Sequence, residues 1–129
     1  MYRNSNGNRN RVKASVDGIE FDSKKEAKRY SQLKLMQELG QIEGLQRQVP
    51  FELIPPQYDA DKVGKRGGVK KGKCLERAVE YIADFTYYQN GEYIVEDVKG
   101  WKANNPDYRL FVIKRKLMLY VHGIRIKEV

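Results

Sequence analysis

Residues 77–99 read RAVEYIADFTYYQNGEYIVEDVK, with two runs of β-forming residues on either side of an Asn-Gly pair. Tyr, Ile, Val, Phe and Thr are enriched in strands, where their side chains pack on a pleated surface. Asn90-Gly91 suits the positive φ angles of a tight turn. The pattern therefore predicts a β-hairpin, with one strand from Arg77 to Tyr88 and the other from Glu92 to Lys99.

The predicted hairpin carries two acids and a lysine that share one region of the sheet. Side chains alternate between the two faces of a strand, so we expect Asp97 and Lys99 on the same face. Pairing around the turn brings Asp84 close to Asp97. Neighbouring carboxylates repel each other, and a Mg²⁺ ion, which prefers carboxylate oxygens, removes that repulsion. The alternative is a salt bridge of Lys99 with one of the two acids on a solvated face.

The sequence before the hairpin predicts a helix and then a strand. Ser23 is a good N-cap with Glu26 three residues later, and Gly40 ends a helix over about 23–39. An extended strand is expected over 42–54, closed by two prolines. A short strand or hairpin is expected at 16–21.

The sequence after the hairpin predicts a second helix and a last strand. Pro106 suits the first position of a helix that runs to about 121, where His122-Gly123 ends it. The strand covers 124–129. The main elements thus run helix, strand, strand, strand, helix, strand.

The net charge of +8, from 25 Lys and Arg against 17 Asp and Glu, is concentrated in two segments, 1–13 and 62–73. Neither contains an acid, and outside them 15 basic and 17 acidic residues remain. Basic segments favour a polyanion such as a nucleic acid, because they release counterions from phosphates. The alternative is a solubilising tail or a solvated loop. The candidate contacts are Arg3, Arg9, Arg11, Lys13, Lys62, Lys65, Arg66, Lys70, Lys71 and Lys73, with Lys102 in the loop after the hairpin.

Composition bounds the organisation of the chain and the classes of site it can hold. We expect a disordered basic arm over 1–15 and a single domain over 16–129, with a flexible basic loop at 57–75. One cysteine and one histidine exclude an internal disulfide and a multi-histidine metal centre. No apolar run is long enough to cross a membrane and no secretory signal is visible, so a cytoplasmic protein is expected.

The order of these motifs resembles the PD-(D/E)XK nuclease superfamily over about residues 18–129. The resemblance rests on Tyr81-Ile82-Ala83-Asp84-Phe85, then Val95-Glu96-Asp97-Val98-Lys99-Gly100 on the next strand, with an upstream helix that begins in Gly18-Ile19-Glu20-Phe21-Asp22-Ser23-Lys24-Lys25-Glu26-Ala27. The sequence looks most similar to small phage and prophage nucleases of the Holliday-junction-resolvase and transposon-end types. The resemblance implies an α/β fold with a restriction-endonuclease-like αβββαβ core, a mixed central sheet flanked by helices.

The resemblance also implies roles for individual residues. Asp84 and Asp97 correspond to the metal-binding acids, together with the backbone carbonyl of Val98, and Lys99 corresponds to the catalytic lysine. Glu26 resembles the helix-borne acid that holds a metal-bound water or a second metal. Its rival role is structural, because Ser23-x-x-Glu26 is also a capping box.

Two further features stay open at this point. Gln48 is a polar residue in a strand that should be largely buried; similar nucleases place a Gln near the metal site, and an edge-strand position is the alternative. Lys114, Arg115 and Lys116 form a basic run in the second helix, which fits either a solvated face or phosphate contact.

The resemblance implies a Mg²⁺-dependent DNA endonuclease, with Mn²⁺ as a substitute and no small-molecule cofactor. It implies branched DNA as substrate, a homodimer, and a role in phage or prophage recombination within the bacterial host cytoplasm, without a membrane partner. The alternatives are a catalytically silent nucleic-acid-binding module on the same fold, a duplex-nicking transposon-end-type nuclease, and an RNA-binding basic protein.

Overall fold

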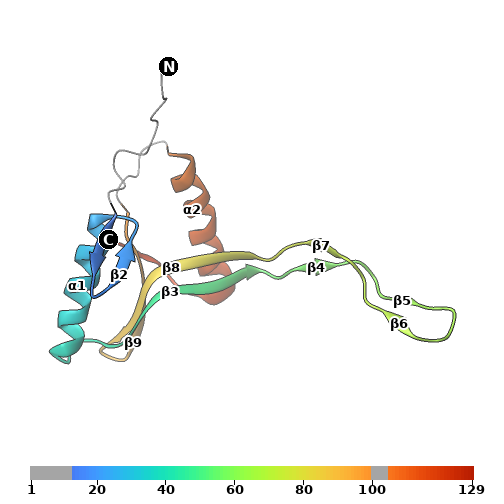
Figure 1. The fold of residues 1–129 in the computed structure, drawn as a ribbon, viewed down its shortest axis with the longest axis horizontal. Helices are drawn as coiled ribbons and strands as arrows, with labels where there is room; N and C mark the ends of the chain where they lie inside the picture. The colour runs from blue at the N-terminus through green and yellow to red at the C-terminus, as the bar shows by residue number, and fades with distance from the viewer. Residues whose placement is uncertain (1–12, 100–104) are drawn as a thin grey trace, which may run out of the picture.

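A four-stranded mixed sheet forms the centre of the molecule in the computed structural model, which describes residues 13–99 and 105–129 (Figure 1). Its strand order is β10 (Lys127–Glu128), β9 (Glu92–Asp97), β8 (Val79–Gln89) and β3 (Glu43–Ile54). β10 runs parallel to β9, while β9, β8 and β3 pair antiparallel. The predicted α/β class with a mixed sheet is confirmed.

The two helices, α1 (Lys24–Glu38) and α2 (Pro106–Leu117), pack on opposite faces of this sheet. Glu96 of β9 is fully buried and pairs with Arg29 of α1, with 2.8 Å between Oε1 and Nη2. The preceding residue, Val95, belongs to the buried cluster of Phe111 on α2. Since consecutive strand residues point to opposite faces, α1 and α2 lie on different sides of β9.

Two hydrophobic clusters follow from this arrangement, one under each helix. The α1 cluster comprises Phe21, Ala27, Tyr30, Leu33, Ile42, Phe85 and Tyr87. The α2 cluster comprises Leu53, Tyr81, Ala83, Val95, Phe111, Met118 and Ile126. Burial of these side chains fixes the helices on the sheet, at about 1.5–3 kcal/mol for each large apolar group.

The predicted ends of the helices are confirmed by their caps. The Ser23 hydroxyl accepts the Glu26 N–H at 3.1 Å, and Gly40, with φ 75°, follows the end of α1. Asn105 caps α2 by accepting the Asp107 N–H at 2.9 Å. After α2 a π-helical turn, Met118–His122, ends at Gly123 with φ 67°. No helix among the described residues has the length and apolar character needed to cross a membrane.

The disordered arm predicted over 1–15 is wrong for its last residues. β1 (Ala14–Val16) pairs antiparallel with β2 (Ile19–Phe21). Asp17 and Gly18 both have positive φ, 52° and 75°, which makes the two-residue turn that joins antiparallel strands. The hairpin expected at 16–21 is therefore present and begins earlier, whereas residues 1–12 lie outside the described part of the chain.

The flexible loop predicted at 57–75 is also wrong, because this segment forms paired strands. β4 (Gln57–Tyr58) pairs with β7 (Cys74–Glu76), and β5 (Lys62–Val63) pairs with β6 (Val69–Lys70). We call residues 57–76 the basic ribbon; it projects far from the helices and the sheet (Figure 1). β3 and β8 stay paired as far as Ile54 and Val79, so the two ends of the segment leave the sheet side by side and can continue as an antiparallel pair.

Candidate active site

Asp84 and Asp97 face each other where the pairing of β8 with β9 ends. The last registered pair is Phe85 with Glu96, and the next residue on each strand is one of the two acids. The Val98 N–H, which follows Asp97, donates to Oδ2 of Asp84 at 2.8 Å. We call the point beyond the pair of Phe85 with Glu96, where β8 and β9 separate, the fork. The carboxylate of Asp84 takes the place of a backbone acceptor there.

Glu26 and Gln48 reach the same place from α1 and β3. The Gln48 side-chain amide donates to Oε1 of Glu26 at 3.3 Å and approaches Oδ1 of Asp84 at 3.5 Å. Glu26 is only 8% exposed, so its carboxylate lies inside the molecule beside the sheet. The structure therefore brings together Glu26, Gln48, Asp84 and Asp97, which come from four separate elements.

In the capping box considered for Glu26, the carboxylate would accept the backbone N–H of Ser23, whereas Glu26 contributes its backbone N–H to the cap and its carboxylate to a different contact. Its backbone N–H donates to the Ser23 hydroxyl, which caps the helix. Its side-chain carboxylate accepts the hydrogen bond from Gln48. The helix cap therefore does not prevent the carboxylate from serving the site.

Gln48 has a backbone conformation that is unusual for its residue type. Its φ is 50°, in the left-handed region that side chains disfavour, although it lies inside β3. It sits between Arg47, paired with Phe85, and Val49, paired with Ala83, so it lies opposite Asp84. Strain of this kind persists only where the surrounding structure holds it, and it clusters at functional sites.

β8 also changes its packing at this point. Tyr81 and Ala83 belong to the α2 cluster, whereas Phe85 and Tyr87 belong to the α1 cluster. The odd-numbered side chains of β8 therefore pack under α2 before Asp84 and under α1 after it. The left-handed backbone of Gln48 in β3 and the change of face in β8 together place the Gln48 amide against Glu26 and Asp84.

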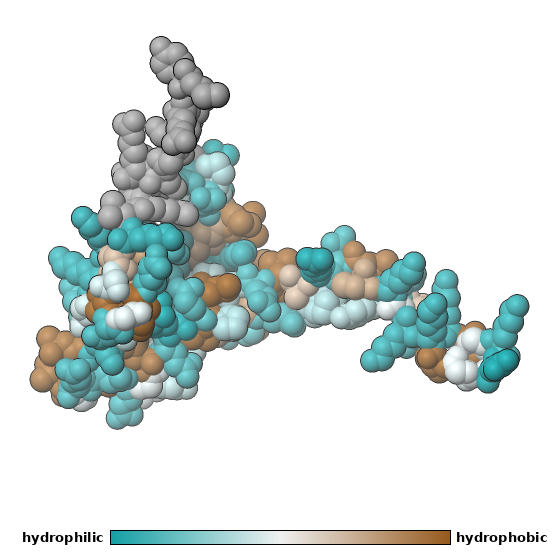
Figure 2. Space-filling model, in the orientation of Figure 1, coloured by the Kyte–Doolittle hydropathy of each residue, from teal (hydrophilic) through white to brown (hydrophobic). Residues whose placement is uncertain are grey.

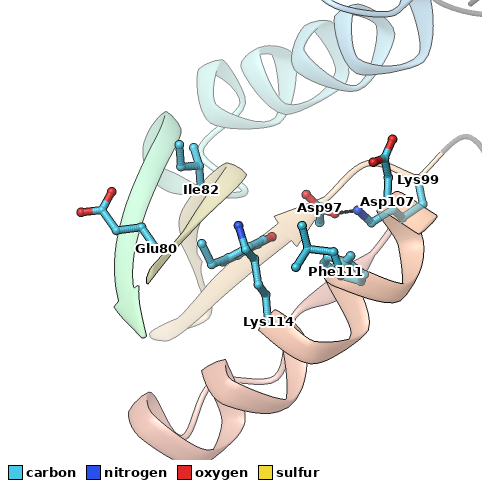
Figure 3. A pocket seen from close by; sticks show the side chains of 9 residues that line it. Glu80, Ile82, Asp97, Lys99, Asp107, Phe111 and Lys114 are labelled. Atoms are coloured by element: carbon cyan, nitrogen blue, oxygen red, sulfur yellow. Dashed lines mark ion pairs between the residues drawn. The ribbon is translucent and has the colours of Figure 1, made fainter. Parts of the chain in front are cut away.

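Lys99 closes the site on the side of α2. Its ammonium forms an ion pair with Oδ2 of Asp97 and lies 3.6 Å from the centre of the Phe111 ring. The salt bridge considered as the alternative to a catalytic site is thus formed, on a partly buried face. Figure 3 shows this pair beside Phe111 and Lys114. The surrounding pocket is lined by Glu80, Tyr81, Ile82, Asp97, Lys99, Asp107, Leu110, Phe111 and Lys114.

Burial and nearby negative charge raise the pKa of three groups at the site, Asp84, Glu26 and Tyr81. Burial, followed by the negative charge of Asp97, raises the pKa of Asp84 to about 7, although the Val98 N–H opposes the shift. Burial and then Asp22 raise the pKa of Glu26, and the nearby Arg47 guanidinium lowers it. Burial and the charges of Asp97 and Asp84 raise the pKa of the Tyr81 hydroxyl. The negative charges of the acids at the site are therefore only partly balanced by the neighbouring basic side chains.

Of the predicted nucleic-acid contacts, six belong to the basic ribbon, which projects away from the sheet that carries the acids (Figure 1). Lys62, Lys65, Arg66, Lys70, Lys71 and Lys73 are all exposed on the basic ribbon. Lys13 pairs with Glu20 of β2 at 3.3 Å. Arg3, Arg9, Arg11 and Lys102 lie outside the described residues.

Two cations close to the site were not expected from the sequence. The Lys25 ammonium donates to the carbonyl oxygen of Lys99 at 2.5 Å, which ties the first turn of α1 to the end of β9. Arg47 lies over the Phe21 ring, 4.5 Å from its centre, close enough to influence Glu26. Both are ordinary basic residues in sequence, and only the packing of α1 on the sheet places them here.

The donor set of the site fits Mg²⁺ in its chemistry. Asp84, Asp97 and Glu26 offer carboxylate oxygens, which hard divalent cations prefer, and the raised pKa of Asp84 marks charge that a cation would stabilise. In residues 13–99 and 105–129, no group of three or more His, Cys, Asp and Glu side chains converges closely enough to hold an ion as placed. The Lys99 ammonium forms an ion pair with Asp97 in this arrangement, so metal binding would require these side chains to move.

We expect replacement of Asp84 by Asn to stabilise the protein increasingly as the pH rises. With the pKa of Asp84 at about 7 when folded and about 3.9 when unfolded, the folded state binds more protons between these pH values. The free energy of unfolding of the wild type therefore falls as pH rises through this window. Asn keeps an acceptor for the Val98 N–H and cannot ionise.

Urea denaturation without divalent metal would measure this effect. Relative to wild type, Asp84→Asn should gain on the order of 1–3 kcal/mol between pH 4 and pH 8. The matched control is Glu43→Gln, which removes a carboxylate at an exposed position outside the site. A constant difference between Asp84→Asn and wild type would contradict the raised pKa.

We expect Gln48→Gly to relieve the backbone strain at residue 48 while it removes the side chain that contacts the acids. Glycine adopts positive φ without a steric penalty, so the change removes backbone strain worth about 1 kcal/mol or more. It also removes the amide that contacts Glu26 and Asp84. Thermal denaturation should show Gln48→Gly to be more stable than Gln48→Ala, which loses the amide and keeps the strain. Equal stability of these two variants would show that the left-handed backbone at residue 48 is not strained.

The comparisons with known proteins identify a family and assign no activity. No curated protein and no solved structure matches the chain significantly. A family model described as "Protein of unknown function (DUF1064)" matches residues 8–125. That match covers most of the 129 residues, so the chain belongs to the DUF1064 family.

Proposed function

We propose that this protein is a Mg²⁺-dependent DNA endonuclease whose catalytic residues are Asp84, Asp97, Lys99 and Glu26. The observation that carries the proposal is the meeting of Asp84 and Asp97 at the fork between β8 and β9, beside the ammonium of Lys99. Asp97 is buried and Asp84 is partly buried; neighbouring acids in such a place are costly to a fold, and a role in binding a cation and a phosphate would explain why they lie together.

The order of elements supports the same proposal. α1, β3, β8, β9, α2 and β10 follow each other as helix, three strands, helix and strand, with the helices on opposite faces of the sheet. This is the αβββαβ order that the resemblance to PD-(D/E)XK nucleases implies. The β1–β2 hairpin and the basic ribbon are additions to that core.

The proposal gives each residue a separate task. Asp84, Asp97 and the Val98 carbonyl would hold Mg²⁺ or Mn²⁺, which when bound acts as a Lewis acid that activates water and neutralises phosphate charge. Lys99 would leave Asp97 to contact a phosphate oxygen, where its charge stabilises the negative transition state.

Glu26 and Gln48 would orient the attacking water. The raised pKa of Glu26 makes this carboxylate a better proton acceptor near neutral pH than an exposed one. The hydrogen bond from Gln48 holds it beside the acids. In-line attack on the phosphodiester would leave 5′-phosphate and 3′-hydroxyl ends, as the resemblance implies.

The proposed substrate and assembly rest on the exposed cations and on the resemblance. The exposed cations of the basic ribbon, with Arg3, Arg9, Arg11, Lys13 and Lys102, provide contacts for the DNA backbone. The resemblance to Holliday-junction resolvases extends the proposal to branched DNA and to a homodimer, because two symmetric cuts require two sites related by a two-fold axis.

The test compares wild type with Asp97→Ala and Lys99→Met on a four-way junction, linear duplex DNA, single-stranded DNA and RNA. With Mg²⁺ the wild type should cleave DNA and make paired cuts in the junction. Each variant should lose on the order of 10²-fold or more of the rate and keep its affinity for DNA in EDTA. Glu43→Gln is the control and should cleave like wild type.

Two results would overturn this proposal. One is undiminished cleavage by pure Asp97→Ala protein. The other is a failure of the wild type to bind Mn²⁺ in a calorimetric titration while it still binds DNA, which would identify a catalytically silent module. A preference for RNA over every form of DNA would favour the RNA-binding alternative.

A further inference from the structure

The basic ribbon is built as a projecting two-stranded element with its cations outward. Its tip is a turn over 64–68, in which the Gly64 N–H donates to the Gly68 carbonyl at 2.7 Å and the Gly67 N–H to the Gly64 carbonyl at 3.0 Å. Figure 2 shows hydrophilic side chains gathered at this far end. The ribbon is thus a narrow rod with charge at its end.

The pairing within the ribbon places like charges opposite each other. Lys62 is the direct cross-strand partner of Lys70, and Val63 is the partner of Val69. Like charges directly opposite destabilise a strand pair, and the two valines are 75% and 70% exposed. The lysine pair therefore does not improve the fold of the isolated chain, and it indicates a surface that meets an anionic partner.

Backbone contacts fix the bend between the two halves of the ribbon. A side chain at Gly72 would overlap the carbonyl oxygen of Asp59, so the two strands approach here more closely than any other residue allows. Asp61 accepts the Gly72 N–H at 2.8 Å, and the Asp59 N–H donates to the Lys73 carbonyl at 2.8 Å. The carboxylate of Asp61 is therefore turned to the backbone, and the basic tip keeps a defined direction.

We propose that the basic ribbon enters the major groove of duplex DNA at a distance from the cleaved bond. This inference rests on the proposed function and adds to it the form of nucleic acid and the groove. A two-stranded ribbon, with strands about 4.8 Å apart, fits the major groove of B-DNA, about 12 Å wide, whereas the minor groove, about 6 Å wide, would have to be widened at a cost in DNA deformation to admit it. The deep, narrow major groove of duplex RNA excludes it.

Charge and reach agree with this placement. Lysines on both strands of the ribbon would face the phosphates on the two sides of the groove, while Lys65 and Arg66 in the turn reach the base edges, where Arg and Lys pair best with guanine. An extended strand rises about 3.3 Å per residue, so the path from Gln48 to Arg66 spans at most about 60 Å. This upper limit allows the tip to contact a groove as far as one turn of DNA, about 34 Å, from the site.

The test measures DNA binding in EDTA, where cleavage plays no part. The ribbon variant Lys62→Gln/Arg66→Gln/Lys70→Gln should bind a 30-base-pair duplex at least tenfold more weakly than wild type. Its salt dependence should fall by up to about three units of slope, roughly one for each cation removed. The matched control, Lys28→Gln/Arg125→Gln/Lys127→Gln, removes three exposed charges elsewhere and should bind within about twofold of wild type if only the ribbon enters the groove.

Groove-specific probes complete the test. Wild type should protect guanine N7 from dimethyl sulfate, lose affinity for DNA with glucosylated hydroxymethylcytosine in the major groove, and tolerate netropsin in the minor groove. Inhibition by netropsin alone, equal binding of duplex RNA, or equal binding by the ribbon variant would each overturn the inference. If any of these results is found while wild type still cleaves DNA with Mg²⁺, the groove inference fails and the proposed endonuclease function stands. If wild type binds in the major groove and does not cleave, the groove inference stands and the proposed function fails.

Discussion

The contact between Asp84 and Asp97 is the constraint on which the candidate site of this protein depends. The two carboxylates meet where β8 and β9 separate, and one of them accepts the Val98 N–H that no strand partner reaches. Burial, followed by the negative charge of Asp97, raises the pKa of Asp84 to about 7. The fold tolerates this cost because α1, through Arg29 and the fully buried Glu96, is held to β9 immediately beside the acids.

The neighbouring elements all contribute one group to this contact. α1 supplies Glu26, β3 supplies Gln48 through a left-handed backbone, and the end of β9 supplies Lys99 against the Phe111 ring of α2. None of these groups is near the others in sequence. The acids of the site lie in the body of the molecule, whereas the basic ribbon carries a cluster of six exposed cations, which fits the proposed separation of chemistry from DNA binding.

The hairpin and its acids could be predicted because their signals are local. Asn90-Gly91 sets the turn, and counting outward from it places Asp84 opposite Asp97. The positive φ of Gln48 could not be predicted, since it comes from tertiary packing against Asp84 and Glu26. The basic ribbon was missed because Gly and Lys indicate a loop, whereas the pairing of β3 with β8 holds the two ends of the segment together. The sequence could not decide whether Lys99 forms a salt bridge with an acid or serves as a catalytic lysine, because both roles use the same residues.

The most direct measurement of the central claim is a titration of the Asp84 carboxyl by ¹³C NMR, with and without Mg²⁺. Without metal the account predicts a pKa of about 7 for Asp84. With saturating Mg²⁺ the pKa should fall well below this value, because a bound cation stabilises the ionised carboxylate. Titration near pH 4 in both conditions, or a raised pKa that Mg²⁺ leaves unchanged, would contradict the account.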